Sequence, residues 1–468
     1  MPTWPVHLKI ANRLKEKYNY TDDFILGNVI PDTMNGHIIN NPSNIFHHAV
    51  THYSTADFND FLEINIDKFL KENKEKLENE VILGTYTHLL ADKYFNDYTR
   101  EHHFKKVEDT IYPILNDGTI DEKNHPMVMK QEDFRIFGEQ FIKNNEVGNK
   151  ISLTKDTIKL CKDLNYPVEK EDIEKTIDKI NEIVDTKITE EENCKMFTEK
   201  ELTDVYNSCY EMIDTTLHEL DLDNKITKVF DNYVSRYDEE DNDIAYKYYH
   251  SYRVMNYAKK LSKKLNLSKE DQKLATIIGL FHDIGRFEQD KLFDSYIDTK
   301  KFDHGDYGAE VLIKQELIKE LPVEEKYYSL ISKAVKNHNK YSIEEGLSDQ
   351  ELLHAQLVRD VDKLDILDYM SKGKLRKKAF DYTDETFTIR PEIKEEFFQQ
   401  KIIYTKNKSN INNSEKAIIT LAFVFDIKFK ETAEYILNNS ILDSFYNILP
   451  NKENYKEYFD LAKKHLKE

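Results

Sequence analysis

Cysteine, glycine and proline are all scarce in this chain of 468 residues. The three cysteines are too few and too scattered for a disulfide framework or a cysteine-type zinc site, and their odd number fits a reducing compartment. Only 12 glycines and 10 prolines interrupt a sequence rich in lysine, glutamate, leucine and isoleucine. This composition favours helices over sheets.

Long hydrophobic runs and a targeting segment are also missing. No stretch approaches the roughly 18–20 apolar residues of a membrane span. The start, "MPTWPVHLKI", lacks the basic and then apolar segments of a signal peptide. We therefore expect a cytoplasmic protein without stable membrane insertion. The net charge of −20 repels phosphate backbones, so duplex nucleic acid is not expected as a partner.

Histidine, by contrast, is concentrated in two parts of the chain. Eight of the 16 histidines lie within the first 103 residues, and five more lie between residues 250 and 354. Two clusters predict two sites in two domains. The seam should fall within residues 217–243, where one helical pattern ends in acidic residues, another begins near Lys225, and "DEEDND" breaks it. We predict an all-α chain with domains at residues 1–222 and 223–468.

Apolar periodicity predicts the helices that carry these histidines. Helices are expected over residues 6–18, over 81–98, which is apolar nearly all round, and over 243–265. A further helix, "KEDQKLATIIGLFHD", should be capped by Ser268, with Asp271 at the capping-box position, and should stop at Gly285.

Polar residues in the second half point into apolar surroundings. His250 shares a helical face with Val254, and Asp362 has Val358 four residues before it. His282 and Asp283 end an apolar helix. Unpaired, each buried polar group would cost several kcal/mol, on the order of 2–7. Each one alone is explained by a hydrogen bond or an ion pair, but the set together favours a shared divalent cation.

These residues resemble the HD superfamily of metal-dependent phosphohydrolases, named for its adjacent His-Asp pair. The pattern is carried by His250, by His282 with Asp283, and by Asp362 in "VDKLD", over roughly residues 225–468. The resemblance to binuclear members of the family implies that His304 and His338 hold a second metal.

The nitrogen and oxygen donors of this set, with no sulfur, suit Mn, Fe, Zn or Mg. One metal, or two about 3.5–4 Å apart, would bind phosphate oxygens and lower the pKa of a water molecule. Asp283 would ligate or bridge, and Arg286 and Lys363 would hold phosphate oxygens. The alternative for these two basic residues is solvated surface charge.

The first cluster consists of His7, Asp32 at a proline turn, "IFHHAVTHY", and His88 four residues before Asp92 on a buried helix. A His–Asp ion pair has the same spacing as that last pair. Together these motifs resemble the zinc-dependent phospholipase C family. The resemblance implies one zinc on Asp32, His88, Asp92 and one of His47, His48 and His52, with His48 preferred, and a second zinc on His7 and Asp92.

That family also implies a catalytic role for Asp32, as the candidate general base. This chain departs from the secreted enzymes, which expose an N-terminal tryptophan, because Trp4 lies behind three residues. A third zinc set is not cleanly present.

The combined expectation is a hydrolase that cleaves P–O bonds of a small soluble phosphate ester, with a nucleotide as the favoured substrate. One alternative is a regulatory protein that binds a nucleotide or phosphate through the same metals without turnover. Another is a purely structural role, in which the metals stabilise the fold.

Overall fold

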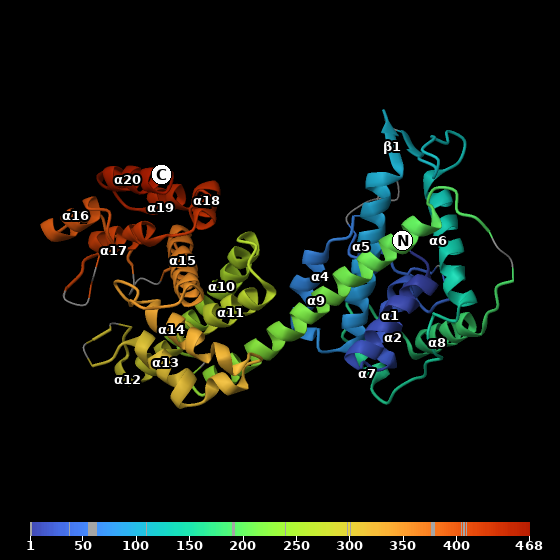
Figure 1. Ribbon diagram of the computed structural model, residues 1–468, viewed down its shortest axis with the longest axis horizontal. Coiled ribbons are helices and arrows are strands. Elements are labelled where there is room, and N and C mark those ends of the chain that lie inside the picture. Colours follow the sequence, from blue (N-terminus) through green and yellow to red (C-terminus); the bar gives the residue numbers. More distant parts are fainter. Residues whose placement is uncertain are drawn as a thin grey trace. The chain divides into compact units, whose positions relative to one another are not determined.

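The computed structural model describes residues 2–468 except 37, 55–62, 109, 190–191, 239, 297, 300, 376–379, 404, 406–407 and 409. The chain divides into two compact units, Met1–Leu220 and Asp221–Glu468 (Figure 1). Each unit has its own buried hydrophobic core. The described residues are mostly helical, which confirms the all-α prediction.

The N-terminal unit consists of helices and one small antiparallel hairpin. Phe104 pairs with Pro113 in that hairpin, and Val107 pairs with Thr110. The elements are α1 (Trp4–Tyr18), α2 (Asp22–Met34), α3 (His48–Thr51), α4 (Ile66–Asn73), η1 (Lys74–Lys76), α5 (Glu80–His102), β1 (Phe104–Val107), β2 (Thr110–Pro113), α6 (Pro126–Lys143), α7 (Thr157–Cys161), α8 (Lys170–Asp185) and the first part of α9 (Glu199–Val234). Helix α9 continues past Leu220 into the C-terminal unit.

Helices α2 and α5 pack backbone against backbone at two glycines. A Cβ atom added to Gly27 would lie 2.2 Å from the carbonyl oxygen of Val81, and one added to Gly84 would lie 2.2 Å from that of Phe24. Side chains larger than hydrogen would force the helices apart. This close contact brings the polar residues of α2 against those of α5.

The C-terminal unit contains only helices among its described residues. They are the end of α9 from Asp221, α10 (Asn242–Lys264), α11 (Lys269–Phe281), α12 (Ile284–Phe293), α13 (His304–Lys314), η2 (Leu317–Glu320), η3 (Glu325–Tyr327), α14 (Tyr328–Asn337), α15 (Asp349–Ser371), α16 (Pro391–Phe398), α17 (Asn413–Leu421), η4 (Ala422–Asp426), α18 (Lys430–Asn438), α19 (Ile441–Ile448), η5 (Lys452–Tyr455) and α20 (Lys456–His465).

Three local predictions need correction. Helix α9 runs without interruption through the expected break near Lys225, because this stretch holds neither glycine nor proline and its acidic residues do not end a helix. Helix α11 ends at Phe281, and Gly285 lies inside α12 instead of stopping a helix. Asp32 follows Pro31 within α2, where dense burial keeps the helix intact, and not at a turn.

The predicted cap of α11 is confirmed. The side chain of Ser268 accepts a hydrogen bond from the backbone N–H of Asp271. The cap satisfies one of the first amide groups of the helix, which have no partner within it.

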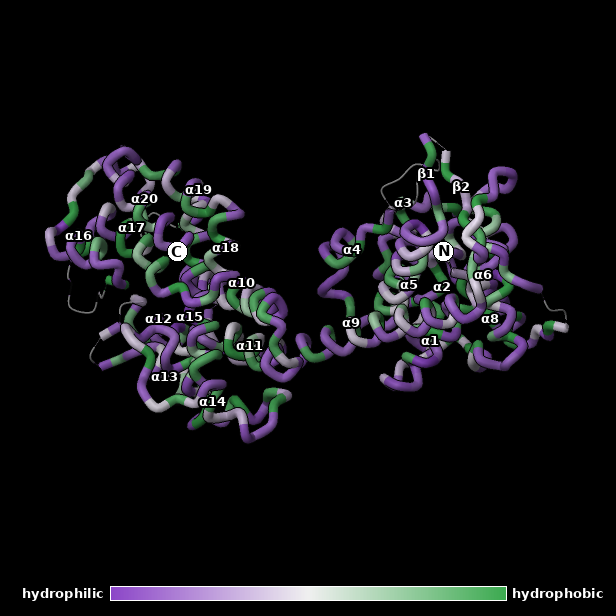
Figure 2. Tube along the Cα trace, turned by 45° about the horizontal axis from the view of Figure 1, so that its top comes forward, coloured by the Kyte–Doolittle hydropathy of each residue, from purple (hydrophilic) through white to green (hydrophobic). Residues whose placement is uncertain are grey.

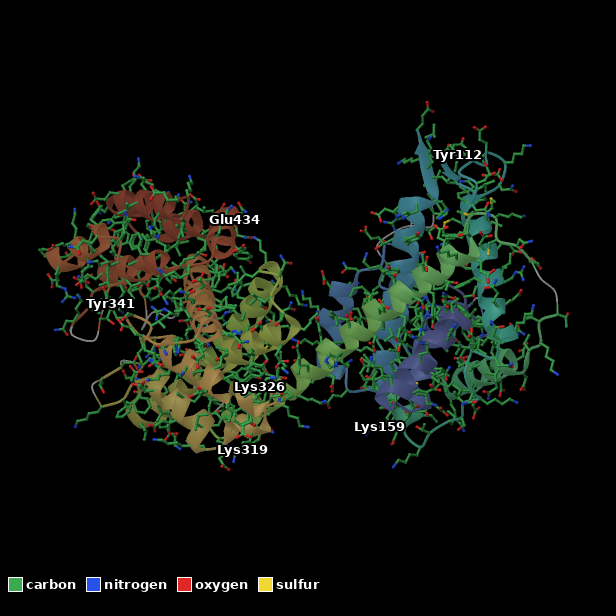
Figure 3. All side chains as sticks on the ribbon, in the orientation of Figure 1. Tyr112, Lys159, Lys319, Lys326, Tyr341 and Glu434 are labelled. Carbon is green, nitrogen blue, oxygen red and sulfur yellow. The ribbon has the colours of Figure 1, made fainter. Side chains whose placement is uncertain are left out.

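Hydrophilic and hydrophobic residues alternate along the helices of both units (Figure 2). Helix α8 is an example, since its buried residues Ile173, Ile177 and Ile180 lie on one face. Charged side chains such as Lys159, Lys319 and Lys326 lie on the outside (Figure 3). Among the described residues, no helix is long and apolar enough to cross a membrane.

Candidate metal centres

A buried group of histidines and aspartates occupies the C-terminal unit, mostly at helix ends. Helix α11 ends just before His282 and Asp283, α13 begins at His304, and α14 ends just before His338. His250 lies within α10. All five side chains are almost completely buried.

Gly285 makes this arrangement possible. A Cβ atom there would lie 2.2 Å from the carbonyl oxygen of His304, so only glycine lets α12 approach the first residue of α13 so closely. This contact brings the ring of His304 to Asp283.

The carboxylate of Asp283 lies between two pairs of histidines. Its Oδ2 atom is 3.4 Å from Nε2 of His250 and 3.5 Å from Nε2 of His282. Its Oδ1 atom is 3.3 Å from Nε2 of His304 and 3.4 Å from Nε2 of His338. Asp362 joins the first pair, since its Oδ1 atom lies 3.2 Å from Nε2 of His250. The donors form two ligand sets that share one carboxylate.

The ring nitrogens within each pair face one another. The two Nε2 atoms of His250 and His282 are 3.2 Å apart, and those of His304 and His338 are 3.0 Å apart. In all four rings Nδ1 lies 2.6–2.8 Å from an oxygen; the oxygens belong to Asp365, Gly279, Asp298 and Val335 in the order of the four histidines.

Carbonyl and carboxylate oxygens only accept hydrogen bonds, so Nδ1 must donate in each ring. A neutral ring then presents a lone pair at Nε2. Two lone pairs aimed at each other and at a carboxylate repel unless a positive charge lies between them. The arrangement therefore fits a divalent cation at each set.

The electrostatics favour the deprotonated form of Asp283 and His338, but not of His250. Burial alone would raise the pKa of Asp283, but the charge of Lys247 and the neighbouring imidazoles hold that pKa well below its usual range. Burial lowers the pKa of His338 to about 4, which leaves the ring neutral at pH 7. Burial and Lys247 lower the pKa of His250, but hydrogen bonds with Asp283, Asp362 and Asp365 raise it to about 10. A proton and a metal cation are thus alternatives at His250.

A second layer of residues fixes the ligands. Asp365 accepts from Nδ1 of His250 at 2.7 Å and from Arg253 at 2.8 and 2.9 Å. Asp298 accepts from Nδ1 of His304 at 2.8 Å. Such partners orient imidazole ligands and raise their basicity. The sequence signal for Asp365 was its place three residues after Asp362 on one helix, whereas Asp298 gave none.

The two basic residues expected to hold phosphate lie in different surroundings. Nε of Arg286 is 3.5 Å from Oδ1 of Asp283 and has no hydrogen-bond partner among the described residues. Lys363 follows Asp362 in sequence, but its Nζ atom lies 3.0 Å from Asp426. The structure therefore brings Arg286 to the cluster and directs Lys363 away from it, because successive helical residues face different sides.

The residues on which the family resemblance depends lie together in the structure. Residues 248–367 match the HD domain. The matched segment includes His250, His282, Asp283, His304, His338 and Asp362, so the resemblance is confirmed for this segment. HD domains bind divalent metals and are generally hydrolases of phosphoester bonds. No curated protein and no solved structure matches the chain.

A second cluster lies in the N-terminal unit, outside the matched segment. Asp92 on α5 places Oδ1 3.2 Å from Nε2 of His7 and Oδ2 3.2 Å from Nε2 of His88. Asp32 on α2 places Oδ1 3.3 Å from Nε2 of His52. Nε2 of His52 and Nε2 of His88 are 3.1 Å apart. These residues form two possible ligand sets that share His88.

Unpartnered atoms indicate that a cation fits here too. Oδ2 of Asp92 has no hydrogen-bond partner among the described residues, although it is buried. Nδ1 of His88 lies 2.7 Å from the carbonyl oxygen of Asn28 and must donate to it, so in the neutral ring Nε2 faces the cluster with its lone pair. Burial opposes a charge on His88, but Asp92 and Asp32 raise its pKa above the usual value, so a proton and a metal cation are alternatives at this nitrogen. A buried carboxylate oxygen without a donor is costly unless it binds a cation.

The structure brings His52, and not the expected His48, into this cluster. His48 begins α3 and its Nε2 lies 3.3 Å from the side-chain nitrogen of Asn35, while its ring packs 3.9 Å from that of His52. His52 follows the short helix and turns inward. Trp4 donates from Nε1 to Oδ2 of Asp32 at 3.0 Å, which fixes that carboxylate.

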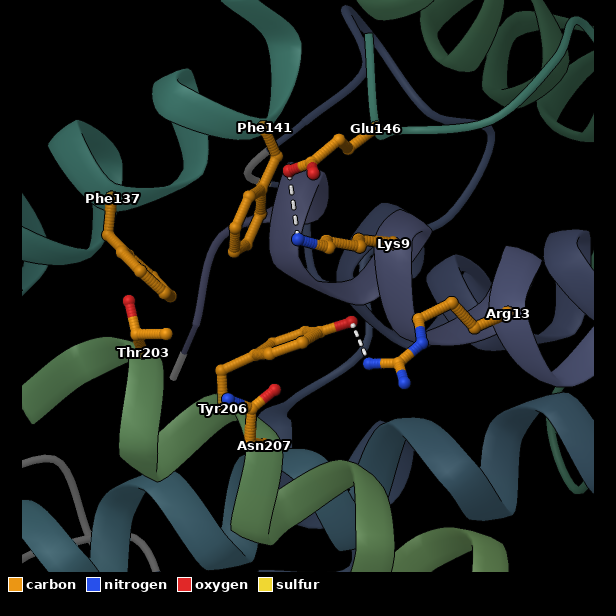
Figure 4. A pocket seen from close by; sticks show the side chains of 8 residues that line it. All are labelled: Lys9, Arg13, Phe137, Phe141, Glu146, Thr203, Tyr206 and Asn207. Atoms are coloured by element: carbon orange, nitrogen blue, oxygen red, sulfur yellow. Dashed lines mark hydrogen bonds and ion pairs between the residues drawn. The ribbon is translucent and has the colours of Figure 1, made fainter. Parts of the chain in front are cut away.

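A pocket of about 410 Å³ lies elsewhere in the N-terminal unit (Figure 4). Its charged groups already have partners: Lys9 donates to Glu146 at 2.9 Å and Arg13 to Tyr206 at 3.2 Å. The cluster residues do not line it. The pocket is therefore separate from the candidate metal centre.

Proposed function

We propose that the C-terminal unit is a metal-dependent phosphohydrolase that acts on a small soluble phosphate ester. The observation that carries this proposal is the position of Asp283, whose two oxygens face two different pairs of histidines. Two divalent cations held there would neutralise phosphate oxygens and lower the pKa of water for attack on phosphorus.

The protein's own residues have three tasks in this reaction. Asp283 and Asp362 hold the cations with the four histidines, and Asp365 and Asp298 keep the rings oriented. The guanidinium of Arg286, beside Asp283, stabilises charge on the transferred phosphoryl group. Burial of the ligands limits access of bulk water.

A nucleotide is the favoured substrate class. The ring of Tyr296 lies 5.5 Å from Nζ of Lys247 and 5.6 Å from the guanidinium carbon of Arg286. Tyr246 packs its ring 6.1 Å from that of His250. Aromatic rings beside basic groups suit a base attached to a phosphate. The strongly acidic chain disfavours duplex nucleic acid.

The decisive experiment compares the wild type with Asp283→Asn on p-nitrophenyl phosphate, bis-p-nitrophenyl phosphate and a nucleotide panel with Mn²⁺. Asp283→Asn should lower kcat/KM by at least about 1,000-fold, because both cations lose a ligand. Asp443→Asn, on an exposed part of α19, is the matched control. A wild type that binds nucleotide with Mn²⁺ but never hydrolyses it would support the regulatory alternative instead.

We also propose that the N-terminal cluster binds zinc and forms a second hydrolase site, in which Asp32 serves as the general base. The support is the convergence of His7, Asp32, His52, His88 and Asp92. Asp92→Asn tests this proposal. Loss of bound zinc together with one hydrolytic activity would support it, whereas loss of zinc and of thermal stability alone would favour a structural role.

A further inference from the structure

Lys247 is a buried cation at the C-terminal centre, and it lies outside both the ligand set expected from the sequence and the matched segment 248–367. It lies one turn before His250 on α10, and the residue is only 8% exposed. Its Nζ atom donates to Oδ2 of Asp283 at 2.5 Å. This oxygen is the one that also faces His250 and His282.

The ammonium group of Lys247 lies next to the place where a metal cation is expected. A divalent cation bound by His250 and His282 would use the same carboxylate oxygen and would lie close to the ammonium group. The two positive charges repel, and burial strengthens the repulsion. A lysine there weakens cation binding unless an anion lies between the two charges.

The charge balance indicates how much negative charge is missing. Among the described residues around the ligands, four carboxylates face three cationic side chains, which leaves one negative charge; the groups are Asp283, Asp298, Asp362, Asp365, Lys247, Arg253 and Arg286. Two divalent cations turn this into three positive charges. A doubly charged phosphoryl group offsets two of them, and a phosphodiester offsets only one.

We propose that Lys247 binds a phosphoryl oxygen of the substrate and makes this centre select dianionic phosphomonoesters over monoanionic phosphodiesters. The inference rests on the proposed function of the same site. On binding, the ammonium group exchanges part of its hydrogen bonding to Asp283 for a charge-assisted hydrogen bond to phosphate. In the reaction, the P–O bond to the leaving group breaks and one forms to water. One proton of the water goes to the leaving oxygen and the products are an alcohol and inorganic phosphate.

Lys247→Gln should therefore change two affinities in opposite directions. Mn²⁺ binding, measured by electron paramagnetic resonance without substrate, should tighten about three- to tenfold because the repulsion is gone. Binding of inorganic phosphate to the Mn²⁺-loaded protein at pH 8.5, measured by calorimetry, should weaken by at least about tenfold. The affinity for dimethyl phosphate, a monoanion, should fall much less. The ratio of the affinity for the dianion to that for the monoanion should therefore be smaller in Lys247→Gln than in the wild type.

Two further variants keep the experiment decisive. Lys247→Arg retains the charge and should keep phosphate binding within a few-fold of the wild type. Lys264→Gln, at the exposed end of the same helix, should change neither affinity. A Lys247→Gln protein that loses Mn²⁺ and phosphate binding together would show a structural role and overturn the inference, as would unchanged phosphate affinity. Failure of the wild type to bind Mn²⁺ would overturn the proposed function instead.

Discussion

The Nε2 atoms of His304 and His338 lie 3.0 Å apart, and each ring uses its Nδ1 atom elsewhere. Two neutral imidazoles do not adopt this geometry for their own stability, because their lone pairs oppose each other. A bound cation converts the repulsion into two ligand bonds. The free energy of unfolding should therefore depend on bound metal, in addition to any dependence of the activity.

Chelation is the first test of this dependence. Saturating Mn²⁺ at about 100 times its Kd should stabilise the protein by about 2.7 kcal/mol, and EDTA should lower the Tm by about 5–10 °C. Calorimetry with and without EDTA measures the effect. His304→Ala should reduce the metal dependence, while His218→Gln, an exposed residue of α9, should leave it intact. An identical Tm with and without EDTA would argue against resident cations.

In the N-terminal cluster, substitutions of His52 and His48 should affect zinc binding differently. In an Asp283→Asn background, which removes the other centre, His52→Gln should weaken zinc binding by at least about 100-fold, because the ring lies between Asp32 and His88. His48→Gln should keep the zinc, since its Nε2 faces Asn35. Elemental analysis after dialysis against zinc of fixed activity counts the bound metal. Equal zinc content in the two variants would contradict the assignment.

Arg359 links α15 to the end of α14. Its Nη1 atom donates to the carbonyl oxygens of Asn337, His338 and Lys340, and its other nitrogens donate to Asp426. A lysine cannot make this fork of hydrogen bonds. Arg359→Lys should loosen the segment that carries His338. The affinity of the Mn²⁺ site that includes His338 should fall by about 10–100-fold, while the affinity of the other site stays unchanged.

The control for Arg359→Lys is Arg236→Lys, at an exposed position. A Mn²⁺ titration should resolve one weakened and one unchanged site in Arg359→Lys and two unchanged sites in the control. Equal weakening of both sites would mean that Arg359 supports the whole fold and not one histidine.

Asp360 predicts a pH effect on stability. Burial raises its pKa to about 6, although the backbone N–H groups of Lys428 and Phe429 donate to it. Because the folded pKa exceeds the unfolded one, its contribution to stability is complete below pH 3.8 and falls as the pH rises through about 6. Asp360→Asn lacks this titration. The free energy of unfolding of Asp360→Asn minus that of the wild type should be about 1–3 kcal/mol more favourable to the variant at pH 8 than at pH 4. Urea unfolding at both pH values tests this, and a constant difference would contradict it.

The sequence alone was sufficient for the helical class and for the local elements, because helix formation depends on residues within a few turns of each other. The cap at Ser268 and the helices around His88 and His250 follow from such patterns. The adjacent His282 and Asp283 were recognisable because a polar pair at the end of an apolar helix needs a partner. Local patterns also misled, since α9 continued through acidic residues that interrupt no backbone hydrogen bond.

Only the tertiary structure decided how the side chains meet. It divided the two oxygens of Asp283 between two histidine pairs, selected His52 over His48, and turned Lys363 toward Asp426. It also placed Lys247 against Asp283. These relationships join residues from different helices, whose contact is fixed by core packing and by backbone approach at glycines such as Gly285. Helical periodicity determines which face a residue occupies, but not which other helix that face contacts.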